Sequence, residues 1–243
     1  MSFTKRTSMK YAFYLALLAA LAACSTTAQT SQSLSAHGFQ EYAPPITKSL
    51  FDDKSATISE ENIQKILNGS YTLPQDLRVS LVKLESAQYL RNYFWNDEEY
   101  LKSQQAYLDL FTSKFSQSDR VKKVSKIPDI LISNNPTFTN IREAAVRTQS
   151  DIVVVYTINS DLYSKYKLFS KSDIKAFATT QLIILDVRTG LIPFSSIVTK
   201  EYLSKREENE LNDAEAANRI KHAAVLLTID EIGDRIAAFL KNE

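Results

Sequence analysis

Residues 151–156 have the sequence Asp-Ile-Val-Val-Val-Tyr, which indicates the central strand of the fold. Four consecutive β-branched residues favour an extended backbone. An apolar run that does not alternate with polar residues is typical of a strand buried on both faces of a sheet. We therefore expect residues 151–156 to form a central strand that other elements cover on both sides.

A short helix is expected immediately before this strand. Thr139 can cap it, because a threonine oxygen accepts a hydrogen bond from the unpaired backbone N–H groups of a first helical turn. Ile141, Ala144 and Ala145 then lie on one face at helical spacing. A helix followed by a buried strand is typical of an α/β sheet.

A hairpin is expected after the strand. A polar connection that contains Tyr163, Tyr166 and three lysines leads to two long extended segments, residues 173–187 and 191–202. The segments meet at an Arg-Thr-Gly turn that ends at Gly190, where glycine can adopt the positive φ of a tight connection. We expect the two segments to be adjacent antiparallel strands.

The remaining elements extend the pattern towards both ends of the chain. Residues 212–241 are Ala-rich with apolar residues at helical spacing, which predicts a long closing helix whose buried face includes Leu227. The amphipathic helix expected over residues 97–115 should bury Leu101. The upstream patterns predict a helix over 59–68 capped by Ser59, a strand over 77–84, an amphipathic helix over 97–115 and a weak strand over 121–127.

This order of elements predicts the fold class. Helices and strands alternate early, and the hairpin comes late. We expect an α/β domain with a mixed sheet of about five strands, helices mainly on one face and a long C-terminal closing helix.

The amino terminus has the pattern of a lipoprotein signal peptide. Lys5, Arg6 and Lys10 precede an apolar run over residues 11–23. This run is shorter than the about 20 residues that a transmembrane helix needs. It ends in Leu-Ala-Ala before Cys24, which matches the lipobox of bacterial lipoproteins, so we expect cleavage between Ala23 and Cys24.

Cys24 is the expected lipidation site, and it is the only cysteine in the chain. A diacylglycerol on its thiol, with a third chain such as palmitate on the new amino group in many bacteria, would anchor the protein, because each buried methylene contributes about 0.8 kcal/mol. Ser25 rather than aspartate follows the cysteine. By the sorting rule of Gram-negative lipoproteins, this favours the outer membrane, on the side that faces the periplasm.

Composition divides the rest of the chain. Residues 24–45 are rich in Ser, Thr, Gln and Ala and are expected to form a lipidated, flexible tether, followed by a single globular α/β domain over residues 46–243. Removal of residues 1–23 changes the formal net charge from +1 to −2. A near-neutral chain has no basic surface for phosphate groups, so we do not expect nucleic-acid binding.

Several local strings resemble one known group of proteins. They are Ile-Arg-Glu-Ala-Ala at 141–145 before the buried strand, Leu-Asp-Val-Arg-Thr-Gly at 185–190, and Arg-Ile-Ala-Ala-Phe-Leu at 235–240. Together they resemble the envelope lipoproteins with a TolB amino-terminal-like domain. This group includes the curli secretion lipoprotein and the activators of penicillin-binding proteins, and the resemblance covers residues 77–240.

The resemblance implies a compact α/β domain that binds other envelope proteins, in some members as an oligomer, and has no catalytic centre. The chain departs from the group at residues 80–85, where Ser-Leu-Val-Lys-Leu-Glu replaces the usual apolar strand and loop. It also has no amphipathic hairpins of the kind that a secretion pore needs. We therefore expect no pore, and no binding residue of the group is carried over.

The sequence contains none of the usual patterns of a catalytic, metal or cofactor site. Its two histidines, His37 and His222, are far apart, whereas a zinc site draws on several His or Cys ligands. We expect His37 in the solvated linker and His222 on the surface of the closing helix or hydrogen-bonded in the core. The chain has four glycines, no Gly-x-Ser-x-Gly and no phosphate-binding loop, so we expect no cofactor.

Adjacent acidic residues and one aromatic cluster are the other candidates for a site. The acidic pairs, which we interpret as solvated surface because neighbouring acids diverge, are Asp52-Asp53, Glu60-Glu61, Glu98-Glu99 and Glu207-Glu208. The aromatic cluster is Tyr89, Tyr93, Phe94, Trp95, Tyr100 and Tyr107. Such a cluster can be a ligand platform, but no partner motif accompanies it, so core and interface packing is the preferred interpretation.

Two classes of function follow. The preferred hypothesis is a lipid-anchored protein-binding or scaffold module without catalysis of its own. The alternative is an envelope hydrolase whose carboxylates the sequence does not identify. A cleft with converging carboxylates would favour the hydrolase, whereas an exposed apolar or aromatic patch would favour binding.

Overall fold

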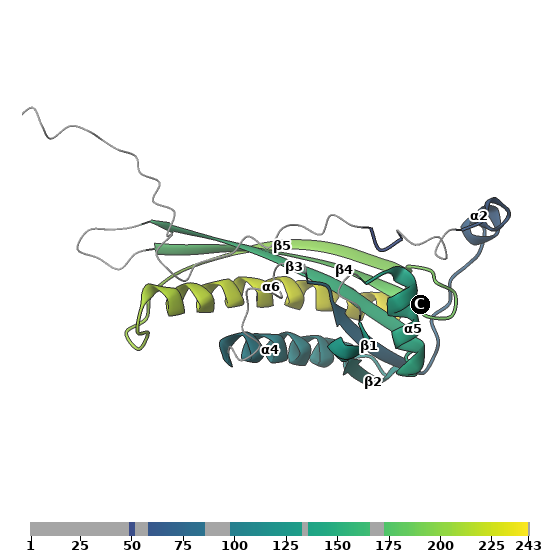
Figure 1. Cartoon of the computed structure of the whole chain (residues 1–243), viewed down its shortest axis with the longest axis horizontal. Coiled ribbons are helices and arrows are strands. Elements are labelled where there is room, and N and C mark those ends of the chain that lie inside the picture. The colour runs from purple at the N-terminus through teal and green to yellow at the C-terminus, as the bar shows by residue number, and fades with distance from the viewer. Residues whose placement is uncertain (1–48, 52–57, 86–97, 133–135, 166–172, 243) are drawn as a thin grey trace, which may run out of the picture. The chain divides into compact units, whose positions relative to one another are not determined.

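A computed structural model describes the chain at residues 49–51, 58–85, 98–132, 136–165 and 173–242 (Figure 1). All of these residues belong to the compact unit Gly38–Glu243. In chain order the elements are α2 (Glu60–Leu67), β1 (Leu77–Lys83), α4 (Glu98–Phe115), β2 (Val121–Lys126), the 3-10 helix η2 (Asp129–Leu131), α5 (Phe138–Arg147), β3 (Ile152–Lys165), β4 (Asp173–Asp186), β5 (Phe194–Lys205) and α6 (Asp213–Asn242).

The described strands form one five-stranded sheet in the order β2-β1-β3-β4-β5. β1 pairs in parallel with β2 and β3, whereas β3 with β4 and β4 with β5 are antiparallel pairs. The sheet is therefore mixed, with a parallel part that comes from the helix–strand alternation and an antiparallel part that comes from the hairpins. The predicted fold class is confirmed.

The first half of β3 is the buried centre of this sheet, as predicted. Ile152, Val153 and Val154 have no exposed surface, and β3 lies between β1 and β4. Even-numbered residues of this half face a larger core that includes Ile152 and Val154, and odd-numbered residues face a smaller core that includes Val153 and Val155. Burial on both faces explains why the sequence here does not alternate.

The second half of β3 corrects one expectation. Residues 157–165 are not a polar connection, because β3 continues to Lys165 and pairs with β4 residue by residue. Ile158 and Leu162 pack against the larger core, while Asn159 and Asp161 alternate with them and lie on the other face. Hydrogen bonding along the antiparallel ladder satisfies the backbone of this polar stretch.

The β4–β5 hairpin is confirmed at the predicted turn. Gly190 has φ +75°, and its N–H donates to the carbonyl oxygen of Asp186 at 2.9 Å. The N–H of Thr189 donates to Asp186 Oδ1 at 2.6 Å. A Cβ atom at position 190 would lie 3.2 Å from Phe138 Cζ, so both the backbone angle and the space favour glycine.

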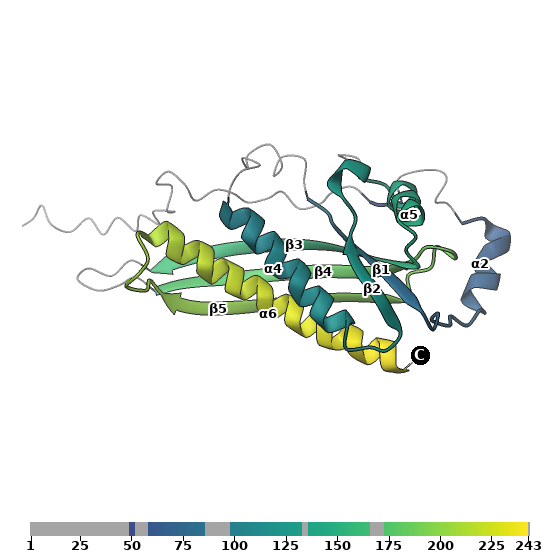
Figure 2. The ribbon, with the colours of Figure 1, turned by 90° about the horizontal axis from the view of Figure 1, so that it is seen from below.

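α4 and α6 pack side by side on one face of the sheet (Figure 2). Phe111 and Phe115 of α4 are fully buried there, together with the isoleucine stripe of α6. The expectation of buried leucines is wrong for Leu101 and Leu227, which are 53% and 42% exposed. One residue turns an α-helix by about 100°, so Leu227 lies about that angle from the buried Thr228, and Leu101 lies about 80° around α4 from Phe111.

The crossing of α4 and α6 is close at Gly233. The aliphatic part of the Lys114 side chain lies over this glycine, where a Cβ atom would overlap Lys114 Cγ. Lys114 Nζ reaches Asp230 Oδ1 at 2.7 Å and Asp234 Oδ1 at 2.5 Å. These hydrogen bonds raise the pKa of Lys114, so the lysine stays charged and ties the two helices together.

α5 covers the other face of the sheet at one end, where Ile141, Ala144 and Ala145 are buried as predicted. The predicted cap is wrong by two residues. Thr137 caps the helix, since its side chain accepts a hydrogen bond from the N–H of Asn140 at 3.3 Å, and Thr139 lies inside the first turn. The predicted helix over 59–68 is α2, although Ser59 at its N-cap makes no side-chain capping bond.

Candidate functional site

The predicted anchor lies outside the described residues. Ala23, Cys24, Ser25 and His37 fall in residues 1–48, and the first four aromatic residues of the cluster fall in residues 86–97. Cleavage, lipidation and the tether therefore stay predictions. Within the part of the chain that the structure describes, no helix is long and apolar enough to span a membrane.

The acidic pairs do not converge on a site. Glu60-Glu61 and Glu98-Glu99 are in the first turns of α2 and α4, and Glu207-Glu208 is in an exposed connection before α6. Asp52-Asp53 lies outside the described residues. Among the described side chains, no group of three or more His, Cys, Asp or Glu is placed to hold a metal ion.

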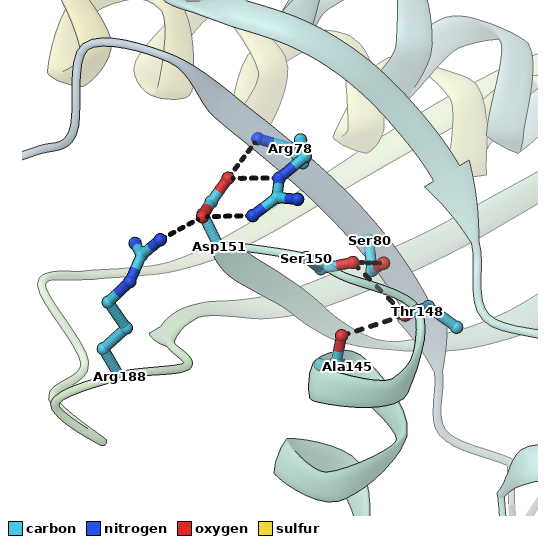
Figure 3. Close-up of polar contacts among 7 residues, drawn as sticks. All are labelled: Arg78, Ser80, Ala145, Thr148, Ser150, Asp151 and Arg188. Carbon is cyan, nitrogen blue, oxygen red and sulfur yellow. Dashed lines mark hydrogen bonds and ion pairs between the residues drawn. The ribbon is translucent and has the colours of Figure 1, made fainter.

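The most concentrated polar site is built around Asp151, which precedes β3 (Figure 3). Its side chain is 3% exposed and accepts hydrogen bonds from both parts of Arg78: the backbone N–H at 2.9 Å, and the guanidinium at 2.9 and 3.0 Å. Arg188 of the β4–β5 turn donates to the same carboxylate at 2.7 Å. One buried carboxylate thus joins β1, β3 and the hairpin turn.

The electrostatics of this site favour a structural role. The side-chain hydrogen bond from Arg78 holds the pKa of Asp151 below its usual range, against the opposing effect of burial. Asp151 also raises the pKa of Arg78 by the same hydrogen bond. A general base works best with a pKa near the working pH, so a carboxylate held fully ionised by two arginines is better suited to fixing three elements in place.

A hydroxyl cluster lies beside this ion-pair network (Figure 3). Ser80 of β1 and Ser150 are both buried and hydrogen-bonded to each other through their hydroxyl groups. The Thr148 hydroxyl donates to the Ala144 carbonyl at 3.0 Å and lies 3.3 Å from Ser150 Oγ. The cluster gives hydrogen-bond partners to the hydroxyl groups between the end of α5 and the start of β3, and buried hydroxyls need such partners.

A second carboxylate completes this end of the sheet. Asp186, at the end of β4, accepts hydrogen bonds from the Tyr71 hydroxyl at 3.1 Å and from the Thr189 hydroxyl at 2.8 Å. Arg142 of α5 donates to the carbonyl oxygens of Val187 and Arg188 at 2.6 and 2.7 Å. We call Asp151, Arg78, Arg188, Asp186 and Arg142 the junction.

A third polar group lies between the end of β1 and the helix α4. Lys83 Nζ is 2.5 Å from Glu85 Oε1 and donates to Gln104 Oε1 at 3.2 Å, while the Tyr100 hydroxyl donates to Glu85 Oε1 at 2.8 Å. Burial lowers the pKa of Lys83 and raises that of Tyr100. The aromatic cluster is therefore partly a packing feature, with a hydrogen bond that fixes Tyr100.

Tyr107, the other described residue of that cluster, packs against His222. Their rings stack with centroids 5.1 Å apart, and the His222 Nδ1 atom lies 3.2 Å from the Tyr107 hydroxyl oxygen. Tyr107 is buried, and burial lowers the pKa of His222. The histidine thus has a hydrogen-bond partner in the core, which is one of the two roles expected from the sequence.

The antiparallel half of the sheet presents a surface that the sequence did not single out. On the side away from α4 and α6, three strands contribute one residue each to four rows. We call these rows the open face: Thr157–Gln181–Ile197, Asn159–Thr179–Thr199, Asp161–Phe177–Glu201 and Tyr163–Lys175–Leu203. None of these side chains is buried, and α5 packs only over the preceding part of β3, at Val153 and Val155.

Contacts among its own side chains order the open face. Tyr163 and Phe177 meet edge-to-face with centroids 5.5 Å apart, and Lys175 Nζ lies 4.7 Å above the Phe177 ring. Lys175 also pairs with Glu201 at 2.5 Å. On the β5 side, Ile197 and Leu203 remain 65% and 63% exposed.

The sequence signal for this surface was the alternation in residues 157–165 and 194–205. The second half of β3 alternates apolar Ile158 and Leu162 with polar residues, as a strand covered on one face does. Asp151 and Arg188 belong to the buried-strand segment and to the hairpin turn that the sequence predicts, but only the folded chain shows that they meet. No local periodicity reports an ion pair between residues 37 positions apart.

No protein-family model matches the sequence, and no curated protein matches it either. The fold is similar to that of several solved structures. A hypothetical protein from Chlamydia trachomatis is 13% identical, with a TM-score of 0.38 over 69% of this chain and 99% of that one.

Two further similar structures are bacterial lipoproteins. Lipoprotein GNA1162 from Neisseria meningitidis is 13% identical, with a TM-score of 0.31 over 67% of this chain and 99% of that one. A minor lipoprotein from Acinetobacter baumannii is 11% identical, with a TM-score of 0.31 over 69% of this chain and 92% of that one. At these values the comparison assigns no family, partner or activity to the chain.

Proposed function

We propose that this chain is a lipid-anchored envelope protein that faces the periplasm and acts by binding another envelope protein through its open face, without catalysis of its own. The anchor rests on the lipobox that ends at Cys24, and placement in the outer membrane rests on Ser25. The observation that carries the binding role is the open face. It is an ordered surface of aromatic, aliphatic and charged side chains that none of the described helices covers.

The composition of the open face suits recognition of a protein. Interfaces are enriched in aromatic residues and combine apolar contact with a polar rim. Here Tyr163 and Phe177 supply aromatic contact, and Ile197 and Leu203 supply aliphatic contact. Because Lys175 is already held by Phe177 and Glu201, binding would order few additional side chains, and this reduces the entropic penalty of association.

The chemistry of two buried carboxylates, Asp151 and Glu210, also supports binding over the hydrolase alternative. A hydrolase of that kind needs one carboxyl group with a raised pKa as the acid. The arginines hold the pKa of Asp151 low, and Glu210 has a lowered pKa because Arg219 donates to it. Both carboxylates are thereby assigned to ion pairs that position the chain.

The test is site-specific photo-crosslinking in intact cells. A photoreactive residue in place of Gln181, which is exposed on β4, the middle strand of the open face, should give a discrete adduct with one envelope protein. The same residue in place of Val146, which is exposed on α5, should not. Combining the Gln181 position with Cys24→Ser should weaken the adduct, because the unanchored domain leaves the membrane surface.

Two results would contradict the proposal. Equal adducts from positions 181 and 146 would show that the open face is not selective. Loss of cellular function on replacing one carboxylate by its amide, in a folded protein whose adduct at position 181 is unchanged, would favour the hydrolase.

A further inference from the structure

The two edges of the sheet differ in how they resist pairing with another strand. β2 is six residues long, carries Lys122, Lys123 and Lys126, and its register with β1 shifts at Leu77/Arg78. Short length, lysines and irregular register all protect an edge. β5 pairs with β4 over twelve consecutive residues with no shift, and it contains no proline.

The outer edge of β5 is therefore a long, regular template. In the part of the chain that the structure describes, β4 is the only strand that pairs with β5, and it pairs with the inner edge. Its open-face side carries Ile197 and Leu203, both more than three-fifths exposed. An exposed regular edge with apolar side chains is the type of edge that pairs with another strand.

The sequence of β5 is complementary to itself in one antiparallel register. Ile197 and Leu203 each lie three residues from Lys200, on opposite sides of it. If two copies of β5 pair about a two-fold axis at Lys200, Ile197 of each copy lies directly opposite Leu203 of the other. Two exposed apolar pairs are then buried at once, and Thr199 lies opposite Glu201, which can accept its hydroxyl proton in a hydrogen bond.

Neighbouring registers lack this match. An axis at Thr199 places Ile197 opposite Glu201, and an axis at Glu201 places two carboxylates opposite each other. Directly opposed residues in an antiparallel pair share a face, so each register pairs open-face residues with open-face residues. Among these three registers, the one centred on Lys200 alone joins the two exposed apolar side chains.

Lys200 itself meets its symmetry mate in this register, on the face that carries α6. Like charges directly opposite destabilise a sheet. Here each Lys200 forms an ion pair with Glu231 of its own α6, so each ammonium group has a counter-ion in its own copy. That counter-ion reduces the repulsion at the axis.

We propose that the chain forms a two-fold symmetric dimer in which β5 pairs antiparallel with β5 of a second copy, centred on Lys200. The axis is perpendicular to the sheet, so both open faces lie on the same side and join into one surface across the dimer. The dimer does not depend on the proposed function, because purified protein can form it without the envelope partner.

The test uses charge complementation at the opposed positions. The full chain is purified in detergent, and its mass is measured by size-exclusion chromatography with light scattering over a range of concentrations. Ile197→Glu and Leu203→Lys should each weaken the dimer by about tenfold or more, because a charge then faces an apolar side chain at two symmetric positions. Mixing the two variants should restore dimers, since Glu at 197 then faces Lys at 203.

Gln181→Lys is the matched control. Gln181 is exposed on the same face beside Ile197 but belongs to β4, so its charge should leave the dimer unchanged. Thermal unfolding of each variant shows that it is folded. A wild-type monomer at all concentrations, dimers that survive both single substitutions, or a mixture that stays monomeric would each overturn the proposal. A dimer that only Gln181→Lys disrupts would place the contact on the open face and would also overturn it.

Discussion

The two halves of β3 lie in one strand but in opposite environments. Ile152–Tyr156 is buried on both faces, between α6 on one side and α5 on the other. From Thr157 to Tyr163 the same strand is covered on one face only, and none of its side chains is fully buried. The first half holds the fold together, while the second half extends the sheet and presents a surface.

This contrast shows how the chain separates stability from exposure. In the junction, Asp151 ties the buried half to β1 and to the hairpin turn through Arg78 and Arg188. Arg142 of α5 and the Asp186 carboxylate hold the backbone of that turn. The exposed half depends on the β4 ladder and on α6 beneath it. A surface for a partner can therefore vary in sequence with little effect on the core.

The largest expected effect is that of Val154→Asp in the buried half. An unpaired carboxylate at this position costs several kcal/mol, which is comparable to the about 5–15 kcal/mol that stabilises a typical domain. The variant should be unfolded or degraded. Asn159→Asp, in the exposed half of the same strand, should change the unfolding free energy by less than about 1 kcal/mol. Urea unfolding followed by circular dichroism measures both, and a stable Val154→Asp protein would remove the distinction between the halves.

The sequence predicted the buried half and missed the exposed half for a physical reason. An unbroken run of β-branched residues is a strong local signal, and Gly190 marked the hairpin by its conformational freedom. Residues 157–165 are polar and carry a weak signal, because their strand conformation depends on pairing with β4. The shift of the helix cap from Thr139 to Thr137 is a boundary error of the same local kind.

The candidate sites were less predictable than the fold. His222 was correctly expected to be hydrogen-bonded or at the surface, since a lone histidine in a helix has few other uses. The junction and the open face, by contrast, are long-range. Asp151 lies 73 positions from Arg78, and the rows of the open face exist only once three strands are in register.

A smaller effect on stability is expected when Asp151, just before β3, or Asp161, in the exposed half of β3, is replaced by alanine. Asp151→Ala leaves the backbone N–H of Arg78 and two guanidinium groups without their acceptor, and should cost about 2–4 kcal/mol. Asp161→Ala in the exposed half removes one hydrogen bond from the N–H of Leu162, and should cost less than about 1 kcal/mol. Chemical unfolding of the two variants side by side gives the difference. Equal losses would mean that the junction does not stabilise the buried half more than the surface does.

The smallest expected effect is a pH dependence that belongs to the buried half. Hydrogen bonding from Arg78 holds the pKa of Asp151 below its ordinary value of 3.8, so the folded state binds this proton less readily than the unfolded state does. Its stabilisation is therefore fully present above the ordinary pKa and is lost as the pH falls through the lowered pKa. Asp151→Asn keeps the shape but not the charge, and should be less stable than the wild type by about 1–2 kcal/mol at neutral pH. This difference in unfolding free energy should narrow steadily below about pH 4.

Glu210 and Glu231 also have lowered pKa values because of hydrogen bonds from Arg219 and Lys200, but they titrate in both proteins, so their contributions cancel in the difference. The measurement is the unfolding free energy of both proteins between neutral pH and acid. A gap that stays constant or widens on acidification would show that the charge of Asp151 does not stabilise the junction.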